Sequence, residues 1–285
     1  MTRTPAPLIL LALSIPAARV PPACAAEPPP APAGWEPVWA DEFDRDGPPN
    51  PAKWDYEEGF VRNKEAQFYT RARAENARVE GGMLVIEARK ERFRNPRFDA
   101  AAKDWRGREW AAYTSASLIT LGRASWTECR IDVRARLPKG AGTWPAIWTL
   151  GIDRGTVAWP RCGEIDILES FGKNPTRAEA NVWFAGKQRP CAGAVTLDRP
   201  LAEDFHLFGM ERSADRIDFF LDSRKYHSFA VNDAGEGADN PFRRPHYLLV
   251  NLALGGTGGG PIDDAALPQQ LAVDYVRVFR RAGAD

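Results

Sequence analysis

Three acidic residues stand close together in one largely apolar segment. Residues 163–170 read Gly-Glu-Ile-Asp-Ile-Leu-Glu-Ser, so Glu164, Asp166 and Glu169 fall among aliphatic residues typical of a buried strand. Carboxylates crowded on one face repel one another and resist joint ionisation, which a strand selected for stability alone would avoid. The segment therefore predicts a site that uses its acids.

The spacing of these acids needs one irregularity before all three can act together. Glu164 and Asp166 are two residues apart and share a face of a strand, whereas Glu169 is five residues from Glu164 and falls on the opposite face. A β-bulge within residues 167–169 would return Glu169 to the face of the other two. We therefore expect a bulge at this point.

Paired carboxyl groups on one concave face can carry out the chemistry of a glycosidase. Hydrolysis with retention uses two carboxyl groups about 5–5.5 Å apart, one attacking the anomeric carbon and the other protonating the leaving oxygen. Asp166, between the other two, would hold the nucleophile by a hydrogen bond and raise the pKa of the acid. The alternative interpretation is a solvated edge strand whose acids merely face water.

Tryptophans accompany the acids in the sequence. Trp144 and Trp148 are four residues apart and would share a face of a strand, and Trp159 leads directly into the acid segment. Flat aromatic faces stack on sugar rings while neighbouring carboxylates act on them, so this grouping favours a sugar-binding cleft. Burial of Trp144 and Trp148 in the core is the alternative.

Alternating polar and apolar residues predict the strands that position these side chains. Between Arg130 and Leu137 the two classes alternate strictly, which describes a strand with one face in the core and one in water. Further strands are expected at 83–88, 216–221, 247–254 and 271–279, and short helical turns at 99–105 and 263–267. Many strands with almost no helix predict an all-β sandwich or jelly roll of two packed antiparallel sheets, in one domain from residue 35 to 281.

The charge balance and the N-terminus restrict the partners and the location. Lysine plus arginine and aspartate plus glutamate number 38 each, without the positive excess of a nucleic-acid binder. Residues 1–26 have the regions of a signal peptide, with an apolar stretch too short to span a bilayer, and a proline-rich leader follows at 27–34. We expect a secreted or periplasmic monomer with a neutral partner and no membrane-spanning segment; a lipid anchor at Cys24 is the less favoured alternative.

Cysteine usage predicts one disulfide. If Cys24 leaves with the signal, Cys129, Cys162 and Cys191 remain, and Cys129 sits in an alternating strand pattern that would bury it. In an exported chain the expected disulfide joins Cys162 to Cys191. None of the three histidines has metal-ligand spacing from a cysteine pair, which argues against a zinc site.

With these motifs in this order, the chain resembles glycoside hydrolase family 16, in particular its bacterial laminarinase-like β-1,3-glucanases. The matches are VWADEF at 38–43, NKEAQFYT at 63–70, ENARV at 75–79, YTSA at 113–116, TWPAIW at 143–148, EIDILE at 164–169 and VDYVRV at 273–278. The resemblance implies a concanavalin A-like β-jelly roll with an open cleft, retaining hydrolysis of internal bonds in a glucan or galactan, and no catalytic cofactor. It favours a β-1,3-glucan or a mixed-linkage β-glucan as substrate.

The resemblance also implies roles for single residues. Glu164 matches the nucleophile, Asp166 its helper and Glu169 the acid/base, and the extra residue before Glu169 resembles the bulged subgroup of laminarinases and agarases. Residues that match sugar-subsite positions are Asn63, Arg73, Trp144, Trp148 and Trp159. Glu42 and Asp274 match positions that in many members ligate a structural calcium, an ion that prefers oxygen ligands.

Two positions depart from the family pattern. Trp183 stands where laminarinase-like members usually carry a histidine near the acid/base, and Arg212 stands where tryptophan is common. Both changes leave the acids in place and bear on the substrate. Three functions therefore stay open: hydrolysis of a glucan or galactan, transglycosylation through the same covalent step, and carbohydrate binding without turnover.

Overall fold

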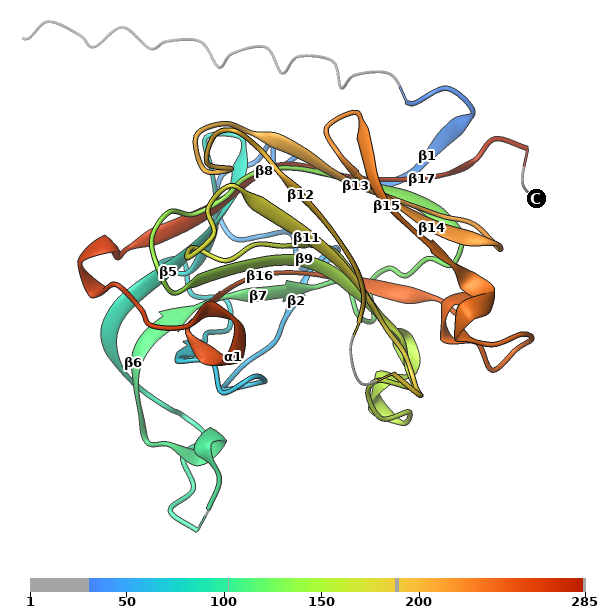
Figure 1. Ribbon diagram of the computed structural model, residues 1–285. Helices are drawn as coiled ribbons and strands as arrows, with labels where there is room; N and C mark the ends of the chain where they lie inside the picture. Colours follow the sequence, from blue (N-terminus) through green and yellow to red (C-terminus); the bar gives the residue numbers. More distant parts are fainter. Residues whose placement is uncertain (1–30, 102, 188–189, 284–285) are drawn as a thin grey trace, which may run out of the picture. The chain divides into compact units, whose positions relative to one another are not determined.

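Two β-sheets make up most of the computed structural model, which describes residues 31–101, 103–187 and 190–283. The first sheet contains, in spatial order, β15 (Arg224–Ala230), β14 (Arg216–Leu221), β13 (His206–Arg212), β8 (Cys129–Arg136), β17 (Gln269–Arg281), β5 (Met83–Arg94), β6 (Trp110–Ser115) and β3 (Gln67–Tyr69), with β1 (Trp35–Asp41) on β17 and β4 (Ala77–Glu80) on β5. The second sheet contains β12 (Cys191–Thr196), β11 (Arg177–Trp183), β10 (Glu164–Glu169), β9 (Thr143–Gly151), β16 (His246–Leu254), β7 (Ser117–Ile119) and β2 (Asp55–Tyr56). The sheets are stacked as two layers (Figure 1).

Helical structure is confined to short turns in the described residues. These turns are α1 (Gly256–Gly259), η1 (Trp105–Gly107), η2 (Ile152–Gly155), η3 (Val231–Ala234), η4 (Pro241–Arg243) and η5 (Asp264–Ala266). The predicted all-β jelly roll is thus confirmed, with the parallel pairing of β3 and β6 as an exception to the antiparallel pattern.

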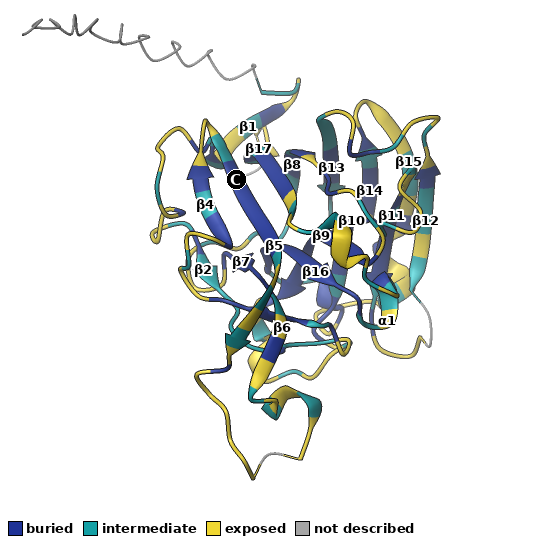
Figure 2. Ribbon diagram, turned by 90° about the vertical axis from the view of Figure 1, so that its left-hand side faces the viewer, coloured by how far each residue is buried: buried dark blue, intermediate teal, exposed yellow. Residues whose placement is uncertain are grey.

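The core lies between the two sheets because alternate residues of the facing strands are apolar. On β8 the buried side chains of Ile131 and Val133 point into it, and on the second sheet Ile147 of β9 and Val250 of β16 do the same. Burying an aliphatic side chain of this size contributes about 1.5–3 kcal/mol. Figure 2 shows the central strands as buried and the loop that joins β5 to β6 as largely exposed.

The predicted strands agree with the observed ones in register and differ at some ends. β14 covers the predicted 216–221, β8 is shifted by one residue at both ends, and β16 begins one residue earlier than predicted. β5 continues to Arg94, well beyond the predicted 83–88, because backbone pairing with β6 extends past the last apolar position. Alternation of polar and apolar side chains indicates which residues of a strand are buried. It does not predict the length of a hairpin whose side chains are partly exposed.

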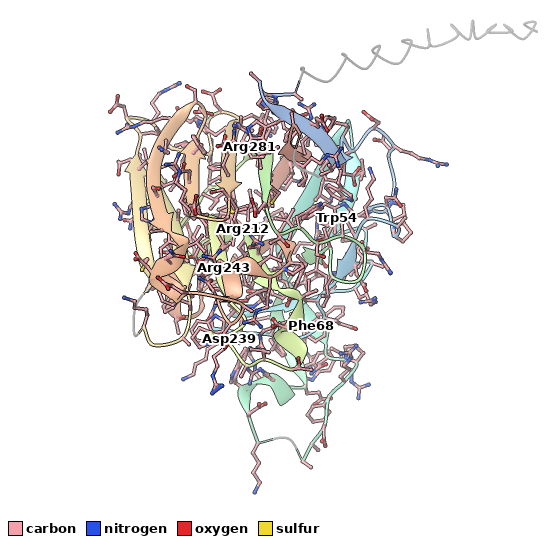
Figure 3. All side chains as sticks on the ribbon, turned by 90° about the vertical axis from the view of Figure 1, so that its right-hand side faces the viewer. Trp54, Phe68, Arg212, Asp239, Arg243 and Arg281 are labelled. Atoms are coloured by element: carbon pink, nitrogen blue, oxygen red, sulfur yellow. The ribbon has the colours of Figure 1, made fainter. Side chains whose placement is uncertain are left out.

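Arg212, one of the two departures from the family pattern, is buried in the structure (Figure 3). Its Nη2 donates to the carbonyl oxygens of Trp126 at 3.1 Å and Arg244 at 2.7 Å. Burial lowers the pKa of this guanidinium to about 10. The side chain therefore ties two segments together through the carbonyl groups of Trp126 and Arg244.

The predicted signal peptide at 1–26, with Cys24, and residues 27–30 of the predicted leader at 27–34 lie outside the described residues. Within 31–101, 103–187 and 190–283, no helix has the length and apolar character needed to cross a membrane. The division of the first 34 residues stays a prediction.

Candidate active site

The predicted β-bulge is present in the acid-bearing strand. Where β10 pairs with β9, Asp166 lies opposite Trp148 and Glu169 lies opposite Ala146, so three steps along β10 match two along β9. The pairing of β10 with β11 shifts between the same two acids. The extra residue turns Glu169 to the cavity face that also carries Glu164 and Asp166.

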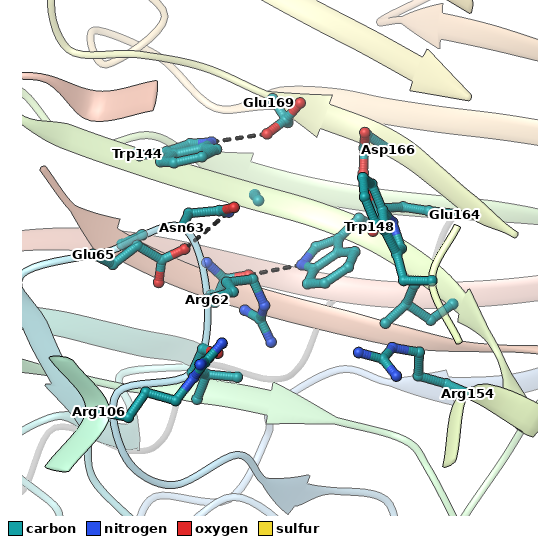
Figure 4. Close-up of a pocket in the computed structure, with 16 residues that line it drawn as sticks. Arg62, Asn63, Glu65, Arg106, Trp144, Trp148, Arg154, Glu164, Asp166 and Glu169 are labelled. Atoms are coloured by element: carbon teal, nitrogen blue, oxygen red, sulfur yellow. Dashed lines mark hydrogen bonds between the residues drawn. The ribbon is translucent and has the colours of Figure 1, made fainter. Parts of the chain in front are cut away.

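A cavity of about 340 Å³ lies on the outer face of the second sheet. Alternation along β9 turns Trp144 and Trp148 toward this cavity and Ile147 toward the core. The indole N–H of Trp148 donates to Oδ1 of Asn251 on β16 at 2.7 Å. The lining residues, most of them labelled in Figure 4, are Val61, Arg62, Asn63, Glu65, Arg106, Trp144, Ala146, Trp148, Leu150, Arg154, Trp159, Glu164, Asp166, Glu169, Asn251 and Ala253.

Two donors hold the carboxylate of Glu169. Nε1 of Trp144 donates to Oε1 at 2.9 Å, and Nδ2 of Asn181 donates to Oε2 at 2.5 Å. Trp144 packs against Phe171, with 5.3 Å between the ring centroids, and against Gly258, where a Cβ atom would come within 2.7 Å of the indole. Because a larger residue at 258 would displace the indole, α1 takes part in orienting this carboxylate.

Glu164 and Asp166 have different surroundings. Nε1 of Trp159 donates to Oε2 of Glu164 at 3.1 Å, and the Trp159 ring lies 5.3 Å from that of Trp183. Asp166 is buried, and its Oδ2 has no hydrogen-bond partner within the described part of the chain. Asp166 therefore reaches the cavity between the two glutamates with unused bonding capacity.

Burial and mutual repulsion raise the pKa of all three acids. Burial is the largest cause for each, and the charge of Glu169 further raises the pKa of Glu164. The charges of both glutamates raise the pKa of Asp166. Since neighbouring carboxylates resist joint ionisation, the cluster keeps protons at pH values where exposed acids have lost theirs, as a general acid requires.

Charged neighbours distinguish the two glutamates. The positive charges of Arg62 and Arg154 act against burial and lower the pKa of Glu164. The charged groups that act most on Glu169 are acidic, Glu65 among them, and they raise its pKa further. The hydrogen bonds from Trp144 and Asn181 lower the pKa of Glu169. Because burial outweighs the lowering effects at both groups, the pKa is raised to about 8 for Glu164 and about 7 for Glu169.

Comparison with known proteins places this geometry in a described family. Residues 64–277 match the sequence profile of Glycosyl hydrolases family 16. The chain belongs to this family. It is 45% identical to a beta-glucanase of Rhodothermus marinus, over 86% of this chain and 85% of that protein. The family predicted from the sequence motifs is confirmed.

Other relatives differ in what their names say they act on. The X-ray structure of the laminarinase from Rhodothermus marinus matches with a TM-score of 0.76 at 43% identity, covering 86% of this chain and 97% of that chain. A keratan-sulfate endo-1,4-beta-galactosidase of Sphingobacterium multivorum is 30% identical over 86% of this chain and 55% of that protein. As a family 16 member, this chain is a retaining glycoside hydrolase.

The structure brings most of the predicted subsite residues of family 16 to the cavity. Asn63, Trp144, Trp148 and Trp159 line it, whereas Arg73 does not. Arg73 instead forms a bidentate pair with Glu91, with nitrogen to oxygen distances of 2.6 and 3.0 Å. Because both arms of the Arg73 guanidinium already bind Glu91, this side chain ties the segment before β4 to β5, which corrects the predicted role in this cavity.

Replacing Arg73 by Lys is expected to lower stability slightly and to leave the KM for glucan unchanged. Lysine cannot reproduce the bidentate geometry, and the pair is partly exposed, so the free energy of unfolding should fall by about 0.5–1 kcal/mol. Chemical denaturation together with steady-state kinetics measures both quantities. A several-fold rise in KM at unchanged stability would restore Arg73 as a substrate-binding residue.

Glu42 and Asp274, the predicted calcium ligands, are each paired with an arginine. Glu42 accepts hydrogen bonds from Arg277 at 2.8 and 2.7 Å, and Asp274 accepts one from Arg134 at 2.6 Å. No group of three or more His, Cys, Asp or Glu side chains suited to a metal ion occurs within 31–101, 103–187 and 190–283. Because each carboxylate is already neutralised by a guanidinium, these residues do not fit the predicted calcium site.

Cys162 and Cys191 are both free in the structure, so the predicted disulfide is wrong. Strand β11 separates them, since Cys191 pairs with Val182 of β11 and Val182 pairs with Ile165 of β10. Two strand spacings amount to about 10 Å, beyond the roughly 7 Å limit between the Cα atoms of a disulfide. Cys162 also packs on the cavity side with Trp148, whereas Cys191 packs against the main core.

The position of Trp183 differs from the expectation for the family histidine. Trp183 pairs with Glu164 across β10 and β11 and packs against Trp159. The β11 residue that contacts the candidate acid/base is Asn181. Trp183 therefore extends the aromatic surface beside the candidate nucleophile, and the hydrogen bond to Glu169 comes from a residue that the motifs did not single out.

Several other cavity residues also escaped the sequence motifs. These are Arg62, Glu65, Arg106, Arg154 and Asn251. Glu65 lies within the motif at 63–70, but the motif does not indicate that its side chain is buried. The three arginines come from loops and turns, where no periodic pattern indicates which way a side chain points.

Proposed function

We propose that this chain is an endo-acting β-1,3-glucanase with Glu164 as nucleophile and Glu169 as acid/base. The observation that carries the proposal is the bulge in β10, which brings both carboxyl groups to the cavity face beside Trp144 and Trp159. The relatives from Rhodothermus marinus, named as a beta-glucanase and a laminarinase, support a β-glucan as the substrate.

The arginines beside Glu164 and the burial of Glu169 bear on these two roles. A nucleophile must be ionised, and the positive charges of Arg62 and Arg154 favour the anion at Glu164. A general acid must hold its proton, and burial raises the pKa of Glu169 to about 7. Asp166, whose pKa both glutamates raise, is suited to keep a proton beside an ionised Glu164.

The proposed reaction has two displacements. First, an oxygen of Glu164 attacks the anomeric carbon, the bond to the leaving oxygen breaks, and Glu169 gives its proton to that oxygen. The result is a glycosyl ester on Glu164. Then Glu169, now a carboxylate, takes a proton from water as the water oxygen attacks the anomeric carbon and releases Glu164. Two inversions restore the starting configuration, and no group beyond the two carboxyls and water is needed.

A polysaccharide panel tests the proposal directly. Laminarin, lichenan, cellulose and agarose are incubated with the enzyme, reducing ends are measured, and the products are sized. The proposal expects laminarin to give the highest rate, with oligosaccharides of several lengths at early times. Release of glucose alone would contradict the endo mode, and binding of laminarin without any reducing-end release would indicate a carbohydrate-binding protein.

A galactan is the second candidate substrate. The similarity to a keratan-sulfate endo-1,4-beta-galactosidase supports it, and Trp183 is a departure from the pattern of the laminarinase-like members. Galactose differs from glucose in the orientation of one hydroxyl group, so a changed aromatic wall beside Glu164 bears on that choice. Higher activity on agarose or keratan sulfate than on laminarin would select this candidate.

The remaining predictions concern the acceptor, the location and the assembly. Transglycosylation would use the same glycosyl ester and deliver the sugar to another sugar hydroxyl, so products longer than the substrate at high acceptor concentration would reveal it. Export through residues 1–26 and a monomeric state are part of the proposal. Mass spectrometry of the mature N-terminus and light scattering measure them.

Replacing Trp144 by Phe is expected to raise the pKa of Glu169. The indole N–H stabilises the ionised carboxylate, so without it the group keeps its proton to higher pH. The alkaline limb of kcat/KM against pH is expected to move upward by about 0.5–1 unit. Trp148→Phe, which removes an indole N–H bonded to Asn251, is the matched control. An equal shift in both variants, or none in the first, would contradict the assignment.

A further inference from the structure

Arg154 is an exposed arginine on the cavity wall that has no hydrogen-bond or ion-pair partner for its guanidinium within 31–101, 103–187 and 190–283. The other two arginines of the cavity are engaged with acids, Arg62 with Glu57 and Arg106 with Asp104. Arg154 therefore presents unused donors to whatever occupies the cleft. In Figure 4 its guanidinium points into the cavity.

The adjacent acid does not neutralise Arg154. The carboxylate of Asp153, the preceding residue, is paired with Arg244 on a neighbouring segment. The backbone carbonyl of Asp153 accepts from the N–H groups of Thr156 and Val157, each at 2.8 Å. These bonds fix the turn η2, so Arg154 extends from an anchored backbone and less conformational entropy is lost on binding.

The ligand surface around Arg154 is that of a sugar site. Arg154 shares the wall with Glu164 and with Trp159, whose side chain is 45% exposed and packs against Trp183. A sugar ring stacked on this aromatic surface would carry its substituents close to the guanidinium. The five donors of a guanidinium match an oxyanion, which can accept two parallel N–H bonds, better than they match single hydroxyl groups.

We propose that Arg154 binds an anionic substituent, a sulfate or a carboxylate, on the glycan held in this cleft. The inference rests on the proposed function, since it assumes that the cleft binds a polysaccharide. With this contact, the enzyme prefers a glycan that carries anionic substituents at this end of the cleft over the same glycan without them. The arginine then determines specificity, in addition to the effect of its charge on the ionisation of Glu164.

The test compares neutral and anionic forms of one backbone. Laminarin, lightly sulfated laminarin and lightly carboxymethylated laminarin are given to the wild type, Arg154→Gln and Arg154→Lys. For each anionic form, the measured quantity is the ratio of its kcat/KM to the kcat/KM on laminarin. This ratio is expected to be about three- to tenfold lower in Arg154→Gln than in the wild type. Arg154→Lys should keep part of the ratio, because the charge remains and the fork is lost. The sulfated and carboxymethylated arms distinguish the two substituents.

A surface control and a salt series separate this effect from general electrostatics. Arg224→Gln removes an exposed arginine at the start of β15 and should leave every ratio unchanged. Raising the NaCl concentration should lower the ratio in the wild type and have little effect in Arg154→Gln, since an exposed pair is screened by salt.

Two results would overturn the proposal. One is an unchanged ratio in Arg154→Gln. The other is an equal loss on all three substrates with a displaced acid limb of the pH profile, which would mean that the guanidinium serves only the ionisation of Glu164. If laminarin itself is not cleaved, the proposed function fails, and calorimetry of sulfated against unsulfated oligosaccharides still tests Arg154 alone.

Discussion

Replacing Glu164 by Gln is expected to lower kcat/KM on laminarin by about 10⁴-fold or more, the scale on which removal of a covalent nucleophile acts. The amide keeps the size of the side chain and can still accept the hydrogen bond from Trp159, but it cannot form the glycosyl ester. Because the charge of Glu164 repels the neighbouring acids, its removal should also raise the free energy of unfolding slightly. Reducing-end release and thermal unfolding measure the two effects.

The control for Glu164→Gln is Glu80→Gln, an equal substitution at an exposed glutamate paired with Arg78 on β4. Its kcat/KM should match the wild type. A rate for Glu164→Gln within tenfold of the wild type would end the assignment of the nucleophile.

An azide experiment with Glu164→Gly sharpens this assignment. With an activated β-glycoside as donor, azide can enter the space left by the side chain and attack the anomeric carbon from the same face. A single inversion then gives the α-glycosyl azide. Formation of the β-azide from this variant would place the nucleophile elsewhere.

Replacing Glu169 by Gln is the second large effect. Loss of the general acid should reduce kcat/KM on laminarin by about 10²–10⁴-fold, since the leaving sugar oxygen then departs without a proton. With an aryl glycoside whose phenolate is stable without protonation, the first step should be much less impaired. The alkaline limb of the pH profile should disappear, because the group that titrates there is gone.

Azide again distinguishes the two glutamates. In Glu169→Gln the glycosyl ester on Glu164 still forms, and azide attacks it with a second inversion to give the β-glycosyl azide. Asn181→Ala is a useful companion, because it removes one donor to Glu169 and keeps the acid itself. Equal losses on laminarin and on the aryl glycoside in Glu169→Gln would contradict a role in leaving-group protonation.

The acid cluster could be predicted because strand parity is a local property. A strand repeats every two residues, so the odd spacing of Glu169 from Glu164 required a bulge if all three acids were to act together. The register of β10 against β9 contains that bulge. The sandwich followed from the same alternation, since Ile131 and Val133 mark the core face of β8 without reference to any partner strand.

Pairings between distant segments could not be predicted in the same way. The disulfide failed because β11 lies between Cys162 and Cys191, and strand order in a sheet is set by the topology of the whole chain. The calcium pair failed because Arg277 and Arg134 occupy the carboxylates of Glu42 and Asp274. Which charged side chains meet depends on register between strands far apart in sequence.

The sequence by itself determined the family, the sandwich and the three acids, because motif order, alternation and spacing are properties of neighbouring residues. Tertiary structure alone decided which groups surround those acids. Trp144 and Asn181 bond to Glu169, while Arg154 faces the cavity with no partner among the residues that the structure describes. The effect of these neighbouring groups on a carboxyl group falls off steeply with distance and with access to water. Distance and exposure are set only when loops and strands from across the chain pack together.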